Sequence, residues 1–466
     1  MIPLSLDEIA QATGGRVHPA HAVSIQVETA VVTDSREAIT GSLYVARRGE
    51  HADGHDYVAH AAAAGAVAAL TDHDVSELPC VVVDDVGDAF AAVGRAVLDR
   101  CIAADGLKVV GITGSSGKTS TKDLMAQVVG RLGRTLAPHA SYNSEVGVPL
   151  TVCRLQRETE FLVAEMGASG VGHIEYLTNI APPDVAVVLN IGSAHLGEFG
   201  SREAIADTKA ALVRALRPEG LAVLNADDPM VRAMAEQSDA PVVLVGRGPQ
   251  AEVRADDVVL NARGQASFVM TLPEQDPVRV SLALHGEHHV GNALAVAAVA
   301  SFWGMPPTQI AAALSGAVAQ SRWRMEVSQR PDGITIVNDA YNANPESMQA
   351  ALRALRAMRA GGRAIAVVGE MRELGADSAA EHERVGEFAA ELGIDDLVAI
   401  GAAAAPAARA FKTARPNRGR QIDEVEQARP VLESMLLHGD VVLLKSSRDS
   451  GLRHLGDALA TGGGDR

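Results

Sequence analysis

The stretch from residue 111 to residue 122, Gly-Ile-Thr-Gly-Ser-Ser-Gly-Lys-Thr-Ser-Thr-Lys, constrains this chain more than any other. An apolar run at 107–112 predicts a buried strand before it, and residues 121–132 are typical of a helix after it. Glycines between a strand and a helix let the backbone approach a phosphate, and the N–H groups at the helix N-terminus then face the anion. We therefore expect a phosphate-binding loop in which Lys118 contacts the terminal phosphates and the Thr119 hydroxyl holds Mg²⁺. Because Ile112 stands where the general pattern has glycine, an ordinary Gly/Ser-rich turn is the competing interpretation.

Strand-like runs alternate with helical segments along most of the chain. The expected strands lie at 27–33, 42–45, 161–165, 184–189, 221–224, 242–245, 334–337, 364–368, 396–400 and 441–444. Helices are expected at 293–302, 345–358, 378–392, 424–437 and 451–459, and Ser5 with Glu8 predicts a capping box at the start of the chain. This alternation predicts an α/β protein whose central sheet is twisted and mainly parallel.

The length of 466 residues predicts three domains at about 150 residues each. We place them at 1–105, an α/β domain; at 106–320, the domain of the phosphate loop; and at 321–466, a smaller doubly wound domain. Ligands of doubly wound sheets bind beyond the carboxyl ends of the strands, so polar residues at those ends are the first candidates for a site.

Composition excludes several classes of function. The formal net charge of −17 argues against nucleic-acid binding, although a local basic site can still hold an anionic small molecule. Cys80, Cys101 and Cys153 are far apart, which predicts buried thiols in a reducing compartment and neither a disulfide framework nor a zinc site. The first residues lack the features of a signal peptide, and the apolar run 293–302 is too short to span a bilayer at about 20 residues. We expect a cytoplasmic monomer without membrane insertion.

Three residues of the middle region could carry chemistry. Glu165 ends an apolar strand, where a carboxylate can reach Mg²⁺ held at the phosphate loop. His195 lies in the loop 190–197 after another strand, and it is either a metal or ligand contact or a structural histidine. Lys209 follows on a helix, where the periodicity alone indicates a solvent-exposed lysine.

Other candidates lie in polar loops, and a solvated loop is the alternative for each. The spacing of His285, His288 and His289 is poor for zinc, so a contact from Asn292 to a base is favoured. Arg324 at a domain junction could stabilise charge on a phosphate during transfer. Basic or polar groups that suit an anionic substrate lie in the segments 35–36, 53–56, 338–345 and 445–448.

Together these motifs resemble the Mur ligase family of peptidoglycan synthesis over essentially the whole chain. The motifs that carry the resemblance are Asp34-Ser-Arg, Asp53-Gly-His-Asp, Thr113-Gly-Ser-Ser-Gly-Lys-Thr, Asn143-Ser-Glu-Val-Gly-Val-Pro, Ala164-Glu-Met-Gly, Gly286-Glu-His, Asn292, Arg324-Met-Glu, Asp339-Ala-Tyr-Asn-Ala-Asn-Pro, Gly369-Glu-Met-Arg-Glu-Leu-Gly and Lys445-Ser-Ser-Arg.

The resemblance implies an ATP-dependent amide ligase with Mg²⁺ as cofactor, in which the first domain binds the UDP of a sugar nucleotide, the second binds ATP and the third binds the incoming amine. The stretches 339–345 and 369–375 indicate the family member that adds D-alanyl-D-alanine to UDP-N-acetylmuramoyl-tripeptide through an acyl phosphate. A sister ligase that adds a single amino acid, and a P-loop ATPase or kinase without ligase chemistry, are the alternatives.

Carried over residue by residue, the resemblance completes the predicted site. The predicted catalytic residues are Lys118, Glu165, His195, Lys209 and Arg324, and the metal ligands are Thr119, Glu165, His195 and a carbamoylated Lys209. Nucleotide contacts are expected from Thr113, Gly114, Ser115, Ser116, Gly117, Lys118, Thr119, Asn292, Arg324 and Asp339. Substrate contacts are expected from Ser35, Arg36, Asp53, His55, Asn143, Tyr341, Asn342, Lys445 and Arg448.

Overall fold

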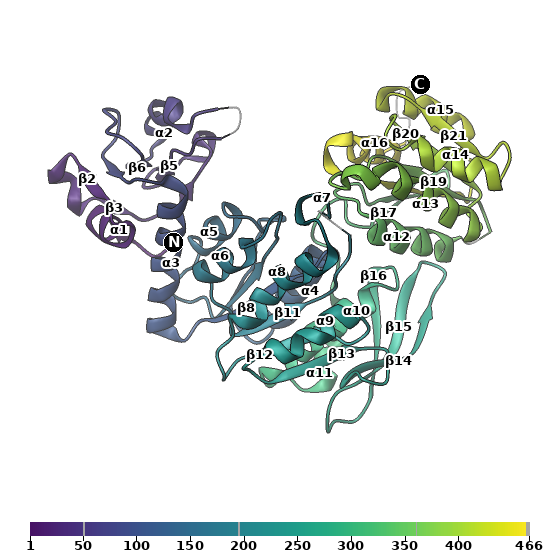
Figure 1. Ribbon diagram of the computed structural model, residues 1–466, viewed down its shortest axis with the longest axis horizontal. Coiled ribbons are helices and arrows are strands. Elements are labelled where there is room, and N and C mark those ends of the chain that lie inside the picture. The colour runs from purple at the N-terminus through teal and green to yellow at the C-terminus, as the bar shows by residue number, and fades with distance from the viewer. Residues whose placement is uncertain (50–51, 194–195, 360, 463–466) are drawn as a thin grey trace.

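The computed structural model describes residues 1–49, 52–193, 196–359 and 361–462, and it shows three α/β bodies in a row (Figure 1). The first begins with the predicted capping box: Glu8 N donates to Ser5 Oγ at 3.2 Å, and Ser5 N donates to Glu8 Oε2 at 2.8 Å. These bonds satisfy backbone donors that the first turn of α1 (Leu6–Thr13) would otherwise leave unpaired, so the cap prediction is confirmed.

A five-stranded sheet in the order β2-β7-β6-β5-β4 forms the N-terminal body, and it is parallel except for β2. The expected single strand at 27–33 is wrong. The chain turns at Glu28 and Thr29, whose N–H groups bond Gly41 O, and this divides the segment between two sheets. The elements are β1 (Leu4–Ser5), β2 (Arg16–His18), η1 (Ala20–Ser24), β3 (Gln26–Val27), β4 (Val31–Val32), η2 (Ser35–Glu37), β5 (Leu43–Val45), η3 (Gly54–Tyr57), α2 (Val58–Ala64), β6 (Ala68–Thr71), β7 (Cys80–Val82) and α3 (Val86–Asp105).

The middle body is built on a nine-stranded sheet in the order β16-β15-β14-β13-β12-β11-β8-β10-β9, which is parallel from β9 to β14. The prediction of a mainly parallel sheet is confirmed. Strands β14, β15 and β16, which pair antiparallel with one another, were not predicted. Their side chains alternate between buried and part-exposed, so they form no apolar run. The strands are β8 (Lys108–Thr113), β9 (Thr135–Leu136), β10 (Phe161–Glu165), β11 (Val185–Val188), β12 (Leu221–Asn225), β13 (Val242–Gly246), β14 (Val253–Leu260), β15 (Gln265–Thr271) and β16 (Val278–His285).

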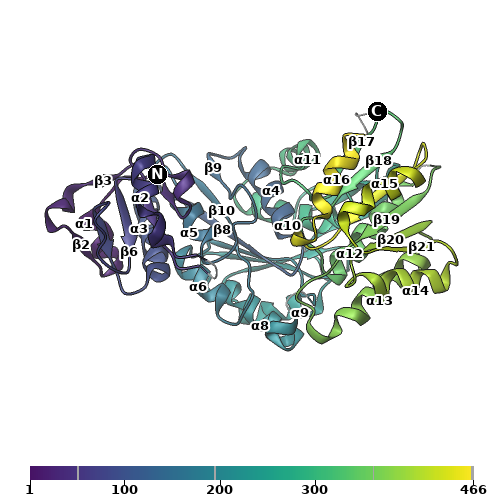
Figure 2. The ribbon, with the colours of Figure 1, turned by 90° about the horizontal axis from the view of Figure 1, so that it is seen from above.

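Helices cover both faces of this sheet, with α4, α10 and α11 on one side and α6, α8 and α9 on the other (Figure 2). Two predicted helix starts are wrong. The helix of the phosphate loop begins at Lys118, directly after Gly117 at φ +82°, and α10 begins at His289, so Asn292 lies inside its first turn. The helices are α4 (Lys118–Val129), α5 (Gly147–Val152), α6 (His173–Ile180), α7 (Leu196–Phe199), α8 (Arg202–Arg214), α9 (Pro229–Arg232), η4 (Ala233–Gln237), α10 (His289–Phe302) and α11 (Pro307–Gly316).

The C-terminal body has a six-stranded sheet in the order β17-β18-β22-β19-β20-β21, parallel except for β17, with helices on both faces (Figure 2). Helix α12 begins with Pro345 at its first turn, as predicted. The elements β17, β21 and α14 were not predicted. The elements are β17 (Glu326–Gln329), β18 (Thr335–Asn338), α12 (Pro345–Met358), β19 (Ala364–Val368), η5 (Gly375–Asp377), α13 (Ser378–Glu391), β20 (Asp396–Ile400), α14 (Ala405–Ala414), β21 (Gly419–Ile422), α15 (Val425–Met435), β22 (Val441–Lys445), η6 (Arg448–Ser450) and α16 (Leu452–Ala460).

The start of α12 joins the middle and C-terminal bodies. Asn344 Nδ2 donates to Ser115 O at 3.2 Å, and Ser193 N donates to Glu346 Oε1 at 2.9 Å. The carboxyl end of the middle sheet therefore faces the third body. Among the described residues, none of the helices combines the length and the apolar character that crossing a membrane requires.

Candidate active site

The phosphate loop is held in shape by its own backbone and by Asn190. Lys118 Nζ donates to Gly114 O at 2.7 Å, and Ser116 N donates to Asn190 Oδ1 at 2.9 Å. Gly117 has a φ of +82°, and a Cβ added there would lie 3.1 Å from Asn292 Oδ1, so both conformation and space favour glycine. Burial lowers the pKa of Lys118, and the nearby Glu165 charge partly offsets that shift. The loop thus presents N–H groups and a desolvated lysine to an anion.

A buried carboxylate lies beside the loop. Glu165, at the end of β10, is 1% exposed, and its Oε1 accepts from Thr119 Oγ1 at 3.2 Å and from Asn143 Nδ2 at 2.7 Å. Its Oε2 is buried and has no hydrogen-bond partner among the described residues. A buried carboxylate oxygen without a donor is costly unless a cation is bound to it. Oxygen ligands from a carboxylate and a hydroxyl fit Mg²⁺, and Thr119 with Glu165 supplies both.

Lys209 is buried, which contradicts the exposed position that the helical periodicity indicated. The residue is 3% exposed because α8 is covered by α6 and α7 as well as by β11. Desolvation, with a smaller contribution from the Lys118 charge, lowers the pKa of the Lys209 amine to about 7. A neutral, nucleophilic amine therefore exists here near neutral pH. His195, the other predicted ligand in this region, lies outside the described residues.

Arg324 brings the C-terminal body to the phosphate loop. Its Nη2 donates to Thr119 Oγ1 at 3.2 Å and to Ser141 Oγ at 3.1 Å, and its guanidinium carbon lies 4.3 Å from the centre of the Tyr341 ring. Arg324 Nε is buried and has no hydrogen-bond partner within the part of the chain that the structure describes. The guanidinium is thus fixed by stacking and retains donor capacity for a phosphate oxygen.

Asp339 and Lys445 form a buried ion pair at the far side of the same site. Lys445 Nζ lies 2.7 Å from Asp339 Oδ2 and donates to Asn342 O at 3.0 Å. Asp339 Oδ1 accepts from Met325 N at 3.0 Å, which ties the pair to the segment that carries Arg324. Arg448 approaches the Tyr341 ring at 5.7 Å. The three basic residues predicted here, Arg324, Lys445 and Arg448, therefore lie in one region.

A cavity of about 450 Å³ lies between the phosphate loop and the C-terminal body. The predicted residues that line it are Ser115, Ser116, Gly117, Lys118, Thr119, Asn143, Glu165, Asn292, Arg324, Asp339, Tyr341, Asn342, Lys445 and Arg448. Thr113, Gly114 and Lys209 are not among its lining residues. Ser141 also lines the cavity and was missed, although it lies two positions before Asn143 in the same polar run. Glu346, which bonds Ser193, was missed because a glutamate in the first turn of a helix reads as an ordinary charge.

The predicted contacts of the N-terminal body form a separate group that does not line this cavity. Arg36 Nε lies 2.9 Å from Asp34 Oδ1, and this guanidinium lowers the pKa of Asp34 to about 2. Ser35 Oγ lies 3.1 Å from His60 Nδ1. Asp53 Oδ1 lies 2.6 Å from His55 Nδ1, so these two predicted residues contact each other.

A phosphate loop, a buried carboxylate and an arginine from the following domain around one cavity define a class: nucleotide-dependent enzymes that move a phosphoryl group between two domains. Sequence models of the Mur ligases match three parts of this chain: the Mur ligase family catalytic domain at 29–116, the Mur ligase middle domain at 112–300 and the Mur ligase glutamate ligase domain at 323–448. The chain belongs to the Mur ligase family.

Named relatives extend over the whole chain. The UDP-N-acetylmuramoyl-tripeptide–D-alanyl-D-alanine ligase of Mycobacterium tuberculosis (strain ATCC 25618 / H37Rv) is 42% identical over 98% of each chain. The Bacillus subtilis (strain 168) ligase of the same name is 31% identical over 91% of this chain and 92% of its own.

Solved structures agree. MurF from Acinetobacter baumannii has a TM-score of 0.89 at 31% identity and covers 98% of this chain and 99% of its own. The MurF ligase from Thermotoga maritima in complex with ADP has a TM-score of 0.81 at 29% identity, over 93% and 97%. The α/β architecture and the ATP-dependent ligase class are therefore those of this chain.

Proposed function

We propose that this chain joins D-alanyl-D-alanine to UDP-N-acetylmuramoyl-tripeptide in peptidoglycan precursor synthesis, with ATP converted to ADP and phosphate. The observation that carries the proposal is the 42% identity, over 98% of both chains, to a ligase of that name. The cavity between the phosphate loop and Arg324 supports it, because phosphoryl transfer needs positive charge on both sides of the γ-phosphate.

The reaction has two steps. A carboxylate oxygen of the tripeptide attacks the γ-phosphorus, and the bond to the β-phosphate oxygen breaks. The products of this step are ADP and an acyl phosphate. The dipeptide amine then attacks the carbonyl carbon, gives up a proton, and phosphate leaves as the amide forms. Lys118 and Arg324 neutralise charge that builds on the phosphoryl oxygens. Closure of the C-terminal body over the cavity excludes water, which would otherwise hydrolyse the acyl phosphate.

Cations complete this assignment. Thr119 and Glu165 would hold Mg²⁺, which would offset charge on the phosphates, and the buried Glu165 oxygen without a hydrogen-bond partner among the described residues supports this role. His195 and a carbamoylated Lys209 are the ligands proposed for a second ion. The amine pKa of about 7 supports carbamoylation, because only a neutral amine adds to carbon dioxide.

The domain roles follow the order of the chain. Residues 1–105 bind the nucleotide sugar through Ser35, Arg36, Asp53 and His55, and residues 106–320 bind ATP, with Asn292 at the base. Residues 321–466 bind the dipeptide, with Arg448 as a substrate contact and Lys445 at the phosphate or the substrate carboxylate. Asp339 of the same domain contacts the ribose of ATP. The dependence on ATP and three buried cysteines that form no disulfide support a cytoplasmic location. We propose a monomer.

Phosphate release from Mg·ATP tests the reaction. The purified chain is given UDP-N-acetylmuramoyl-tripeptide, carrying either diaminopimelate or lysine, with and without D-alanyl-D-alanine. We expect release that requires the dipeptide, together with the pentapeptide mass. D-glutamate and diaminopimelate, each with its own shorter acceptor, are the controls. Release with a single amino acid would move the chain to a sister ligase, and release without any amine would refute ligation. The Lys118→Met variant measures the phosphate release that comes from contaminating ATPases.

A further inference from the structure

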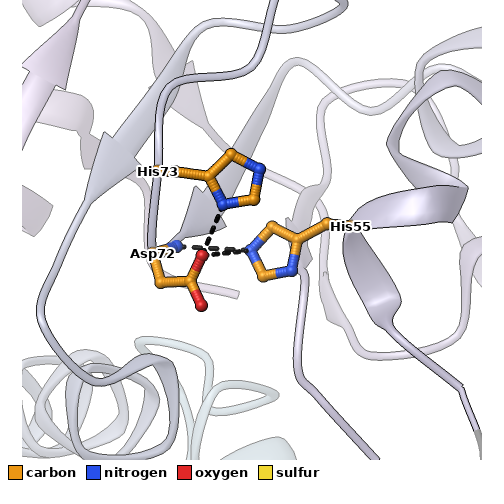
Figure 3. A group of neighbouring side chains, drawn as sticks. All are labelled: His55, Asp72 and His73. Carbon is orange, nitrogen blue, oxygen red and sulfur yellow. Dashed lines mark hydrogen bonds and ion pairs between the residues drawn. The ribbon is translucent and has the colours of Figure 1, made fainter.

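Three potential metal ligands meet in the N-terminal body, and none of them lines the active-site cavity. His55 comes from η3, and Asp72 and His73 directly follow β6 (Figure 3). Asp72 Oδ1 lies 3.3 Å from His55 Nε2 and 2.5 Å from His73 Nδ1. One ligand atom from each residue lies within 4.8 Å of the other two. A carboxylate and two imidazoles are donors typical of zinc-like ions.

The hydrogen bonds of His55 fix its tautomer, so that the nitrogen facing Asp72 carries the lone pair. Asp72 N donates to His55 Nε2 at 3.3 Å, so Nε2 carries a lone pair and the proton is on Nδ1. Nδ1 then donates to Asp53 Oδ1 at 2.6 Å. A carboxylate behind an imidazole is the outer-shell arrangement that orients histidine ligands of metals. The His55 side chain is only 6% exposed, so the ring is held in place by its surroundings.

One of the distances between the ligand atoms already matches that of a bound ion. Tetrahedral ligands with metal–nitrogen bonds of 2.0–2.1 Å lie roughly 3.3 Å apart. His55 Nε2 and Asp72 Oδ1 already have this separation. His73 Nδ1 must move away from Asp72 Oδ1 by less than about 1 Å to reach that spacing. Its ring is 53% exposed, so it has room for this shift and for adjusting its distance to His55, whose ligand atom lies within 4.8 Å. Arg48 Nε contacts the other carboxylate oxygen of Asp72 at 2.9 Å, which leaves Oδ1 as the single ligand atom.

We propose that His55, Asp72 and His73 bind one divalent transition-metal ion of the Zn²⁺ type, with a fourth position open to water. Binding requires the ion to replace the Asp72 N–H donor at His55 Nε2 and requires His73 to carry its proton on Nε2. The ion would tie the segment of Arg48 and Asp53 to the end of β6. Imidazole ligands distinguish this site from the oxygen ligands of Thr119 and Glu165. The site shares His55 with the contacts proposed for the nucleotide sugar, so the ion would hold that side chain beside the sugar-binding segment.

Cobalt titration of the full chain tests the site, because four-coordinate Co²⁺ has an intense visible spectrum. The protein is freed of metal with a chelator and titrated in excess Mg²⁺, which is added to fill the oxygen-lined site proposed at the phosphate loop. We expect one equivalent of Co²⁺ to give that spectrum, and Zn²⁺ to abolish it. His73→Gln should remove the spectrum. His21→Gln, a change at an exposed histidine of the same body, should leave it intact.

The proposal is overturned if the wild-type protein gives no such spectrum, or if His73→Gln binds Co²⁺ as the wild type does. Because His73 is half exposed, its replacement should leave the fold unchanged, and circular dichroism checks this. A second measurement uses the melting temperature: Zn²⁺ should raise it in the wild type and in His21→Gln but not in His73→Gln. An equal rise in all three proteins would also refute the site.

Discussion

Burial makes the Lys209 amine far less basic than an exposed lysine. Its amine has a pKa of about 7, mainly because the charged form is desolvated. At pH 7 about half of the amine is neutral, whereas a lysine at its ordinary pKa is neutral in about one molecule in 3000. Only the neutral amine attacks carbon dioxide to give a carbamate and a proton. We therefore expect Lys209 to be carbamoylated while exposed lysines are not.

The same shift makes a prediction about stability. The unfolded lysine keeps its proton up to the ordinary pKa of 10.5, while the folded one loses it near 7. Burying the charged form therefore costs the folded state about 5 kcal/mol below pH 7, at roughly 1.4 kcal/mol per unit of pKa. The cost decreases as pH rises from 7 to 10.5 and is absent above. Lys209→Met removes it, so this variant should be the more stable protein, by a margin that shrinks toward pH 10.

Two assays check this reasoning. Urea unfolding in buffer free of carbon dioxide, between pH 6 and pH 10, gives the stability difference between wild type and Lys209→Met. Carbon-13 bicarbonate and NMR detect the carbamate, which should be present in the wild type and in Lys412→Met, a change at an exposed lysine, and absent in Lys209→Met. A stability difference that does not vary with pH would refute the lowered pKa, and a carbamate signal that survives in Lys209→Met would refute carbamoylation at Lys209.

Three further substitutions separate binding, chemistry and folding. Glu165→Gln removes the buried charge beside Thr119, so Mg²⁺-dependent phosphate release should fall about 100-fold or more with an unchanged circular dichroism spectrum; release near the wild-type rate would contradict the metal assignment. Gly117→Ala places a Cβ 3.1 Å from Asn292 Oδ1 at a φ of +82°, which should weaken ATP binding in calorimetry by about tenfold, and equal affinity would show that the loop adapts freely. Ser5→Ala breaks the capping box and should cost about 1 kcal/mol in urea unfolding with kcat unchanged; an unaltered unfolding midpoint would mean that the cap contributes nothing.

The sequence determined what depends on neighbours along the chain. The phosphate loop, the buried strands at 161–165 and 364–368, the capping box at Ser5 and the helix that starts at Pro345 were all predicted, because each arises from local conformational preference or from an uninterrupted apolar run. The family motifs, read in order, also indicated the ligase class. Such elements can be recognised from neighbouring residues in the sequence, without knowing which other elements pack against them.

Tertiary structure decided the environment of the charged groups. Periodicity placed Lys209 at the surface, because no pattern in one helix reveals that other elements cover it. Asp339 pairs with Lys445 across 106 residues of sequence, and the contact of Asp72 with His55 depends on the placement of β6 beside η3. Burial and pairing over such separations set the pKa of a side chain and its capacity to bind a ligand, since both depend on which groups and how much water surround it.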